Sequence, residues 1–209
     1  MCRLLLAGRL GIAVPLAPSL DLEGALVGFD APDGDFEAAG LSLRVVRNFN
    51  QKQDNISLTP QRWALSMGFS HQEPNNDFRT AGANRPEAPI MQESSLDLFI
   101  TDGVYVTGNA QTTVAGNAGG YAIGLLGLGY ELPLSENWFI SAEAHLGAAG
   151  GGSVNTSGGT IGGARLELDR TIVGKTRLSL GIGQLQSLKS GGMAPIVTQI
   201  GIKIPFKTN

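Results

Sequence analysis

Apolar and polar side chains alternate with a period of two residues in nearly every segment of this chain. In the segment that runs from Trp138 to Ala148 every second residue is apolar, while Ser141, Glu143 and His145 lie between them. Successive side chains of a β-strand point to opposite faces, so each such segment has one apolar and one polar face. The pattern predicts an all-β fold.

Eleven segments carry this alternation, and turn-forming residues separate them. The predicted strands cover residues 3–15, 19–29, 36–46, 57–70, 94–101, 104–114, 119–132, 137–149, 159–170, 175–187 and 195–206. Their connections are short at 15–19, 102–103, 133–137 and 172–174, and longer at 30–35, 71–93, 150–158 and 188–194. Short turns on one side and long loops on the other are typical of transmembrane β-barrels. The connection at 47–56 does not follow this rule.

Composition supports one strand-rich domain over residues 1–209. Thirty glycines and only 16% charged residues are typical of strands, turns and glycine-rich loops. A formal charge of −3 provides no basic surface for nucleic acid. The single cysteine, Cys2, excludes an intramolecular disulfide and a cysteine-based metal cage. We therefore expect no nucleic-acid partner, no metal and no cofactor.

The strand count raises a question of closure. If the last strand ends on the periplasmic side, strand 3–15 would run parallel to strand 195–206, and single-chain bacterial barrels have an even number of strands. We therefore expect an antiparallel transmembrane β-barrel of about 10–12 strands, in which a first strand would precede Met1 if there are twelve. Ten strands would result if residues 94–114 form one long strand or part of a plug. Residues 1–19 could also form a signal peptide, although Arg9 fits the polar face of a strand better.

Charged residues of the predicted strands lie on the polar faces, and the two signs nearly balance. Charges that share an enclosed space must pair, because an isolated buried ion is very costly. A lysine or arginine that faced lipid would cost about 2–4 kcal/mol at mid-membrane. We therefore expect the polar faces to line a lumen filled by an ion-pair network. Its candidate members are Arg3, Arg9, Asp21, Glu23, Arg44, Arg62, Asp97, Glu143, His145, Arg165, Glu167, Asp169, Arg177 and Lys203.

The last predicted strand carries Ile200, Ile202, Ile204 and Phe206 on one face. It resembles the terminal strands of bacterial outer-membrane barrels, although those usually end on the aromatic residue and this chain continues to Asn209. The resemblance implies an integral barrel in the outer membrane of a Gram-negative bacterium, with membrane lipids as partners. The residues available for its aromatic girdles are Trp63, Phe69, Tyr121, Tyr130, Trp138 and Phe139.

The same alternation also permits a soluble fold with its faces reversed. The apolar rows would then form the core of a lipocalin-like barrel or β-sandwich, and the charges would face water. Such a protein would be a binding module. Glycine inside a predicted strand, as at Gly124, Gly127 and Gly129, indicates bends, bulges or close packing in either fold.

Catalytic chemistry has few candidates in this sequence. Some outer-membrane barrels hydrolyse lipids with serine and histidine, and Ser70 precedes His71. Adjacent strand residues point to opposite faces, so we expect His71 to be a polar loop residue and no residue to be catalytic. Glu167 and Asp169 share a face, an arrangement that a glycosidase or a cation site can use, but Arg165 and Arg177 favour ion pairing.

These observations predict a small porin-like channel or a structural barrel without enzymatic chemistry. A barrel of twelve strands leaves a narrow aqueous path for small polar solutes, whereas eight to ten strands are usually filled by side chains. The alternatives are a lipid hydrolase of the barrel type and a soluble binding protein. The polar segment 71–93 is the place where recognition or gating is expected.

Overall fold

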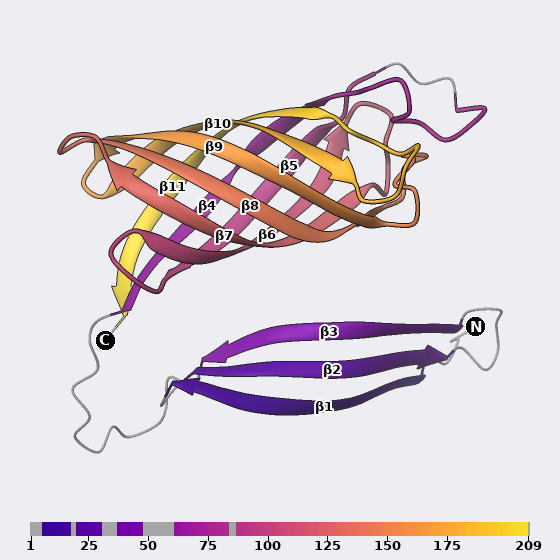
Figure 1. The fold of residues 1–209 in the computed structure, drawn as a ribbon, viewed down its shortest axis with the longest axis horizontal. Helices are drawn as coiled ribbons and strands as arrows, with labels where there is room; N and C mark the ends of the chain where they lie inside the picture. The colour runs from indigo at the N-terminus through magenta and orange to yellow at the C-terminus, as the bar shows by residue number, and fades with distance from the viewer. Residues whose placement is uncertain (1–5, 18–19, 31–36, 48–60, 84–86, 209) are drawn as a thin grey trace, which may run out of the picture. The chain divides into compact units, whose positions relative to one another are not determined.

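The computed structural model describes residues 6–17, 20–30, 37–47, 61–83 and 87–208, and these form eleven β-strands in two separate sheets (Figure 1). The described residues contain no helix that is long and apolar enough to span a bilayer. The strands are β1 (Leu6–Ala17), β2 (Leu20–Asp30), β3 (Glu37–Arg47), β4 (Gln61–Glu73), β5 (Ile90–Phe99), β6 (Val104–Ala115), β7 (Ala122–Pro133), β8 (Trp138–Gly150), β9 (Thr160–Val173), β10 (Thr176–Ser187) and β11 (Ile196–Thr208).

Strands β1, β2 and β3 form an antiparallel sheet in this order. Leu10 and Ile12 are 78% and 74% exposed, and they lie on the apolar face that the sequence pattern predicts. Arg9 and Arg44 both form ion pairs with Glu23, at 2.9 and 2.5 Å. The sheet is therefore amphipathic, with an ion-paired polar face.

Strands β4 to β11 form a closed antiparallel barrel, in which β11 pairs with β4 from Ile196–Glu73 to Thr208–Gln61. Short turns at 100–103, 134–137 and 174–175 lie at one end, called the turn end here, together with the start of β4 and the end of β11. Longer connections, whose described residues are 74–83 with 87–89, 116–121, 151–159 and 188–195, lie at the other end, called the loop end. The alternation of short and long connections thus matches the sequence prediction.

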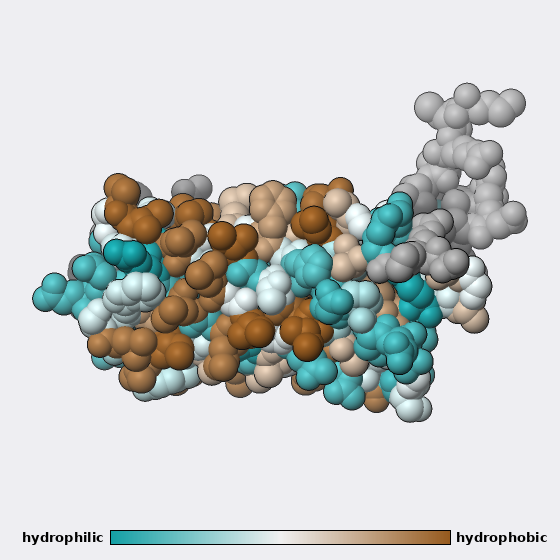
Figure 2. Space-filling model, turned by 90° about the horizontal axis from the view of Figure 1, so that it is seen from above, coloured by the Kyte–Doolittle hydropathy of each residue, from teal (hydrophilic) through white to brown (hydrophobic). Residues whose placement is uncertain are grey.

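Alternation along the barrel strands separates an apolar outside from a mostly polar inside. Outward side chains such as Leu128, Leu146 and Ile182 are 61%, 63% and 56% exposed. Figure 2 shows brown, hydrophobic side chains over much of the surface in view. The soluble alternative, which needs the leucine and isoleucine faces to point inward, is therefore wrong for the barrel strands.

The antiparallel transmembrane barrel is confirmed, but eight strands close it rather than 10–12. The reason is a non-local pairing: β4 takes β11 as its second neighbour, so β1–β3 are not needed for closure. Eight is an even number, so the parity argument for a strand before Met1 does not apply to this barrel. Residues 94–114 form two strands, β5 and β6, and not one. That residues 1–209 form a single domain stays a prediction.

Glycine makes room for one large side chain inside the wall. The ring of Tyr105 on β6 is 1% exposed, lies against Gly129 on β7 and donates a hydrogen bond of 2.7 Å to Glu143. A methyl group added at Gly129 would overlap this ring, which its hydrogen bond and burial hold in place.

We expect Gly129→Ala to lower the free energy of unfolding by about 1–3 kcal/mol, because overpacking forces side chains or backbone to shift. Gly124→Ala is the matched control on the same strand, since an added methyl group there meets nothing within 4 Å. Urea unfolding in detergent micelles measures both variants. Equal stability of the two variants would contradict the packing argument.

Candidate functional site: the barrel interior

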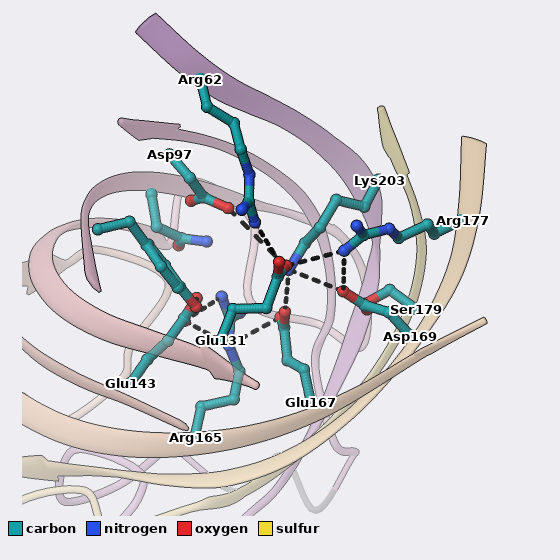
Figure 3. Close-up of polar contacts among 12 residues, drawn as sticks. Arg62, Asp97, Glu131, Glu143, Arg165, Glu167, Asp169, Arg177, Ser179 and Lys203 are labelled. Atoms are coloured by element: carbon teal, nitrogen blue, oxygen red, sulfur yellow. Dashed lines mark hydrogen bonds and ion pairs between the residues drawn. The ribbon is translucent and has the colours of Figure 1, made fainter. Parts of the chain in front are cut away.

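Arg165 on β9 is the centre of the polar interior. Its Nε and Nη2 donate to Glu143 Oε2 at 3.0 and 2.6 Å, and its Nη1 donates to Gln199 at 2.5 Å and also to Glu93. Glu167 lies 3.1 Å from its Nε. The guanidinium group therefore joins three carboxylates that come from β5, β8 and β9 (Figure 3).

Lys203 on β11 holds a second group of carboxylates together. Its Nζ lies 2.7 Å from Glu167, 3.2 Å from Asp169 and 4.0 Å from Asp97. The lysine side chain is only 3% exposed, and Ser179 donates a further hydrogen bond of 2.5 Å to Asp169. Glu167 contacts both Arg165 and Lys203, so the two groups form one network.

The network ends at the turn end in a cluster around Glu131. Arg177 donates to Glu131 at 2.8 Å, and Arg62 donates to the other oxygen of the same carboxylate. Each guanidinium group also lies over an aromatic ring, Arg62 at 3.6 Å from the centre of Phe99 and Arg177 at 3.4 Å from that of Phe139. Stacking and pairing together hold both arginines at the mouth of the barrel.

We call these residues the lumen network: Arg62, Glu93, Asp97, Glu131, Glu143, His145, Arg165, Glu167, Asp169, Arg177 and Lys203. It holds six carboxylates and four permanent cations, so it carries a small excess of negative charge. His145 Nε2 lies 3.0 Å from Glu143 Oε2, so the histidine also belongs to the network. The lumen network joins side chains from opposite walls of the barrel, as Figure 3 shows.

Above the lumen network, towards the loop end, the interior becomes apolar. Phe78 from the β4–β5 loop and Met193 from the β10–β11 loop are both fully buried, and the ring of Tyr121 packs edge-on against Phe78 at 6.3 Å. The Tyr121 hydroxyl donates to Gln72 at 3.3 Å, and burial raises the pKa of this phenol. We call this cluster the apolar cap: Phe78, Met91, Ala118, Tyr121, Ile123, Leu125, Ala149, Val154, Ile161, Leu185, Met193 and Val197.

Hydrogen bonds between the four loops hold the apolar cap together. Arg79 donates to the carbonyl oxygens of Gly116 and Gly152, both at 3.1 Å, and so ties three loops together. Asn155 donates its backbone N–H to Phe78 at 2.8 Å and accepts one from Met193 at 2.8 Å. The described parts of the four loops therefore form a hydrogen-bonded lid at the loop end.

The structure places nine of the candidate lumen residues together inside the barrel, namely Arg62, Asp97, Glu143, His145, Arg165, Glu167, Asp169, Arg177 and Lys203. Arg9, Asp21, Glu23 and Arg44 belong instead to the sheet β1–β3, because those strands do not enter the barrel. Arg3 lies outside the described residues.

Two carboxylates of the lumen network are absent from the sequence prediction. Glu93 lies outside the predicted strand 94–101, but β5 begins at Ile90, and Glu93 then points inward. Glu131 lies between the outward-facing Tyr130 and Leu132, and that alternation could have located it. The loop members of the apolar cap, such as Phe78 and Met193, have no such signal, because irregular loops have no period.

The structure also places the catalytic candidates Ser70 and His71 and the predicted girdle residues. Ser70 is buried and His71 is exposed on β4, so the two side chains point to opposite faces and form no nucleophile–base pair. Among the predicted girdle residues, Tyr121 and Phe139 lie inside the barrel and not on its surface. Tyr121 belongs to the 116–121 connection and packs in the apolar cap, whereas Phe139 shares the inward phase of β8 with Ser141 and Glu143. Trp63 stacks on Phe206 at 6.4 Å near the turn end, close to the level of Trp138 and Tyr130.

Neither a protein-family model nor a curated protein matches this sequence. Among solved structures, Neisserial surface protein A has a TM-score of 0.51 at 11% identity, over 69% of this chain and 97% of that one. The fold is that of an outer-membrane β-barrel. The N-terminal barrel domain of Pseudomonas aeruginosa OprF has a TM-score of 0.47 at 11% identity, over 70% of this chain and all of that one. The KdgM porin has a TM-score of 0.31 at 12% identity, over 98% and 96% of the two chains.

Proposed function

We propose that this protein is an integral barrel of a bacterial outer membrane that acts as a closed scaffold for its loops and not as an open channel. The observation that carries the proposal is the lumen network. Arg165 and Lys203 join carboxylates from opposite walls, and an interior of eight strands is just wide enough for side chains to fill. The apolar cap adds a second closure above it.

Membrane insertion follows from the outer surface. The outward rows of β7, β9 and β11 carry leucine and isoleucine that are about half exposed, and strands of 10–14 residues are long enough for a tilted span. In outer-membrane barrels the short turns face the periplasm and the long loops face outward. This orientation would present the loop end, with the lid that Arg79 ties together, at the cell surface.

The competing function is a porin-like channel for small polar solutes. The sequence alone favours it if the wall has twelve strands, and a charged lumen suits ion conduction. In the eight-stranded barrel the same charges are engaged with one another. We therefore propose a structural or surface-recognition role, with no enzymatic activity.

Conductance in planar lipid bilayers tests the proposal directly. We expect purified, refolded protein to produce no stepwise current, because both the lumen network and the apolar cap close the barrel. Heat-modifiable migration on a gel verifies that the sample contains folded barrel, and a known porin in the same bilayers verifies the assay. Reproducible current steps from folded protein would overturn the closed scaffold and support the channel.

A further inference from the structure

A recess of about 360 Å³ opens at the turn end of the barrel, and Arg62 and Arg177 of the lumen network form part of its lining. We propose that this recess binds a small oxyanion, that is, a phosphate or carboxylate group. This site does not depend on whether the lumen conducts. The residues that carry the argument are Arg62, Phe139, Lys175, Arg177, Phe206 and Lys207, all of which line the recess.

Charge is the first reason for an anion. Four cations line the recess, against one carboxylate, Glu136, in its wall. Glu131 lies beneath it and is shared by Arg62 and Arg177, so it neutralises only part of their charge. This surplus of positive charge contrasts with the rest of the interior, where carboxylates outnumber cations. Because low-dielectric walls focus the field of a charged cleft, the recess should concentrate anions.

Preorganisation is the second reason. The guanidinium group of Arg177 is held over Phe139 at 3.4 Å. Within the described part of the chain, its ion pairs with Glu131 and Asp169 both use Nη1. Because Arg177 lines the recess, its Nε and Nη2 remain as donors for a ligand there. A guanidinium group binds carboxylate or phosphate through two parallel N–H donors, and a fixed orientation lowers the entropic cost of binding.

The position of the recess allows two sources for the oxyanion. Phe206 lines the recess and is 37% exposed next to Trp63, whose apolar row faces outward. A phospholipid headgroup could therefore bring its phosphate to the recess from the side, whereas a soluble phosphate or carboxylate would enter from the open end. Both would meet the same donors.

Intrinsic fluorescence provides the binding assay, because both tryptophans of the chain lie near the recess. Trp63 stacks on Phe206, and Trp138 precedes Phe139. We expect inorganic phosphate, titrated at constant ionic strength into protein in zwitterionic detergent, to cause a saturable change. The double variant Lys175→Gln/Lys207→Gln should bind roughly tenfold more weakly, since each exposed ion pair contributes up to about 1 kcal/mol.

Lys189→Gln is the matched control, since this exposed lysine lies at the loop end, and its titration should equal that of the wild type. Heat-modifiable migration verifies that each variant is folded. No saturable change up to tens of millimolar phosphate, or an unchanged affinity in the double variant, would overturn the site.

Lipid composition separates the two sources. In nanodiscs of phosphatidylcholine alone, the phosphate titration should remain as in detergent if the site takes a soluble anion. If a lipid headgroup occupies the recess, adding phosphatidylglycerol should shift the tryptophan fluorescence by itself and abolish the response to phosphate. Neither lipid effect should appear in the double lysine variant.

Discussion

Replacing Arg165 with alanine should lower the free energy of unfolding by about 3–5 kcal/mol, the usual cost of removing one partner from a buried ion pair. Its side chain is 9% exposed and contacts Glu93, Glu143 and Glu167. The variant leaves these three carboxylates in the interior without the cation that joins them. Urea unfolding in detergent micelles, followed by tryptophan fluorescence and by the heat-modifiable gel shift, measures the loss.

Arg170→Ala is the control for this experiment. Arg170 lies on the same strand, β9, but it is exposed and its guanidinium group lies 5.3 Å from the centre of the Trp138 ring. An exposed cation–π contact contributes about 0.5–1 kcal/mol, so this variant should be nearly as stable as the wild type. Similar losses in the two variants would show that the buried network does not stabilise the barrel.

Lys203→Met should cause a loss of similar size, about 3–5 kcal/mol, that depends on pH. Methionine retains most of the length and apolar volume of lysine but removes the charge that Asp97, Glu167 and Asp169 share. At neutral pH these carboxylates repel one another in the variant. As the pH falls these carboxylates take up protons, and protonated groups no longer need the cation. The deficit relative to wild type should therefore shrink as the pH falls.

Unfolding curves of both proteins at several pH values measure this dependence. Lys207→Met is the control, because it makes the same substitution on the same strand at an exposed position. It should cost less than about 1 kcal/mol at every pH. A deficit of Lys203→Met that stays constant, or grows, as the pH falls would contradict an electrostatic origin.

Local alternation made the strands predictable. β6, β8 and β10 begin and end within one residue of the predicted ranges, because each has a strict period of two and clear turn residues at its ends. The number of strands in the barrel was not predictable in this way. It depends on the pairing of β4 with β11, two strands that are far apart in the sequence. Consecutive strands usually pair, so the sequence pattern favours a pairing of β4 with the strand before it.

The interior was predictable where it continues the alternation. Arg165, Glu167 and Asp169 follow one another at intervals of two on β9, so their shared face could be read directly. Glu93 was missed because the start of β5 is irregular, with a shift of register against β6 between Ile90 and Met91. Phe78 and Met193 come from loops, where burial depends on contacts with other loops and not on a repeating pattern.

The lumen network also governs how this sequence can vary. An outward residue such as Leu128 or Leu146 contacts lipid chains, which have no fixed positions. One aliphatic side chain can therefore replace another there without a compensating change elsewhere. Arg165 serves three carboxylates at once, and Glu167 serves both Arg165 and Lys203. Substitutions inside the barrel are therefore strongly epistatic. In homologous chains we expect independent drift on the outside and coordinated, charge-conserving replacement of whole groups of residues within.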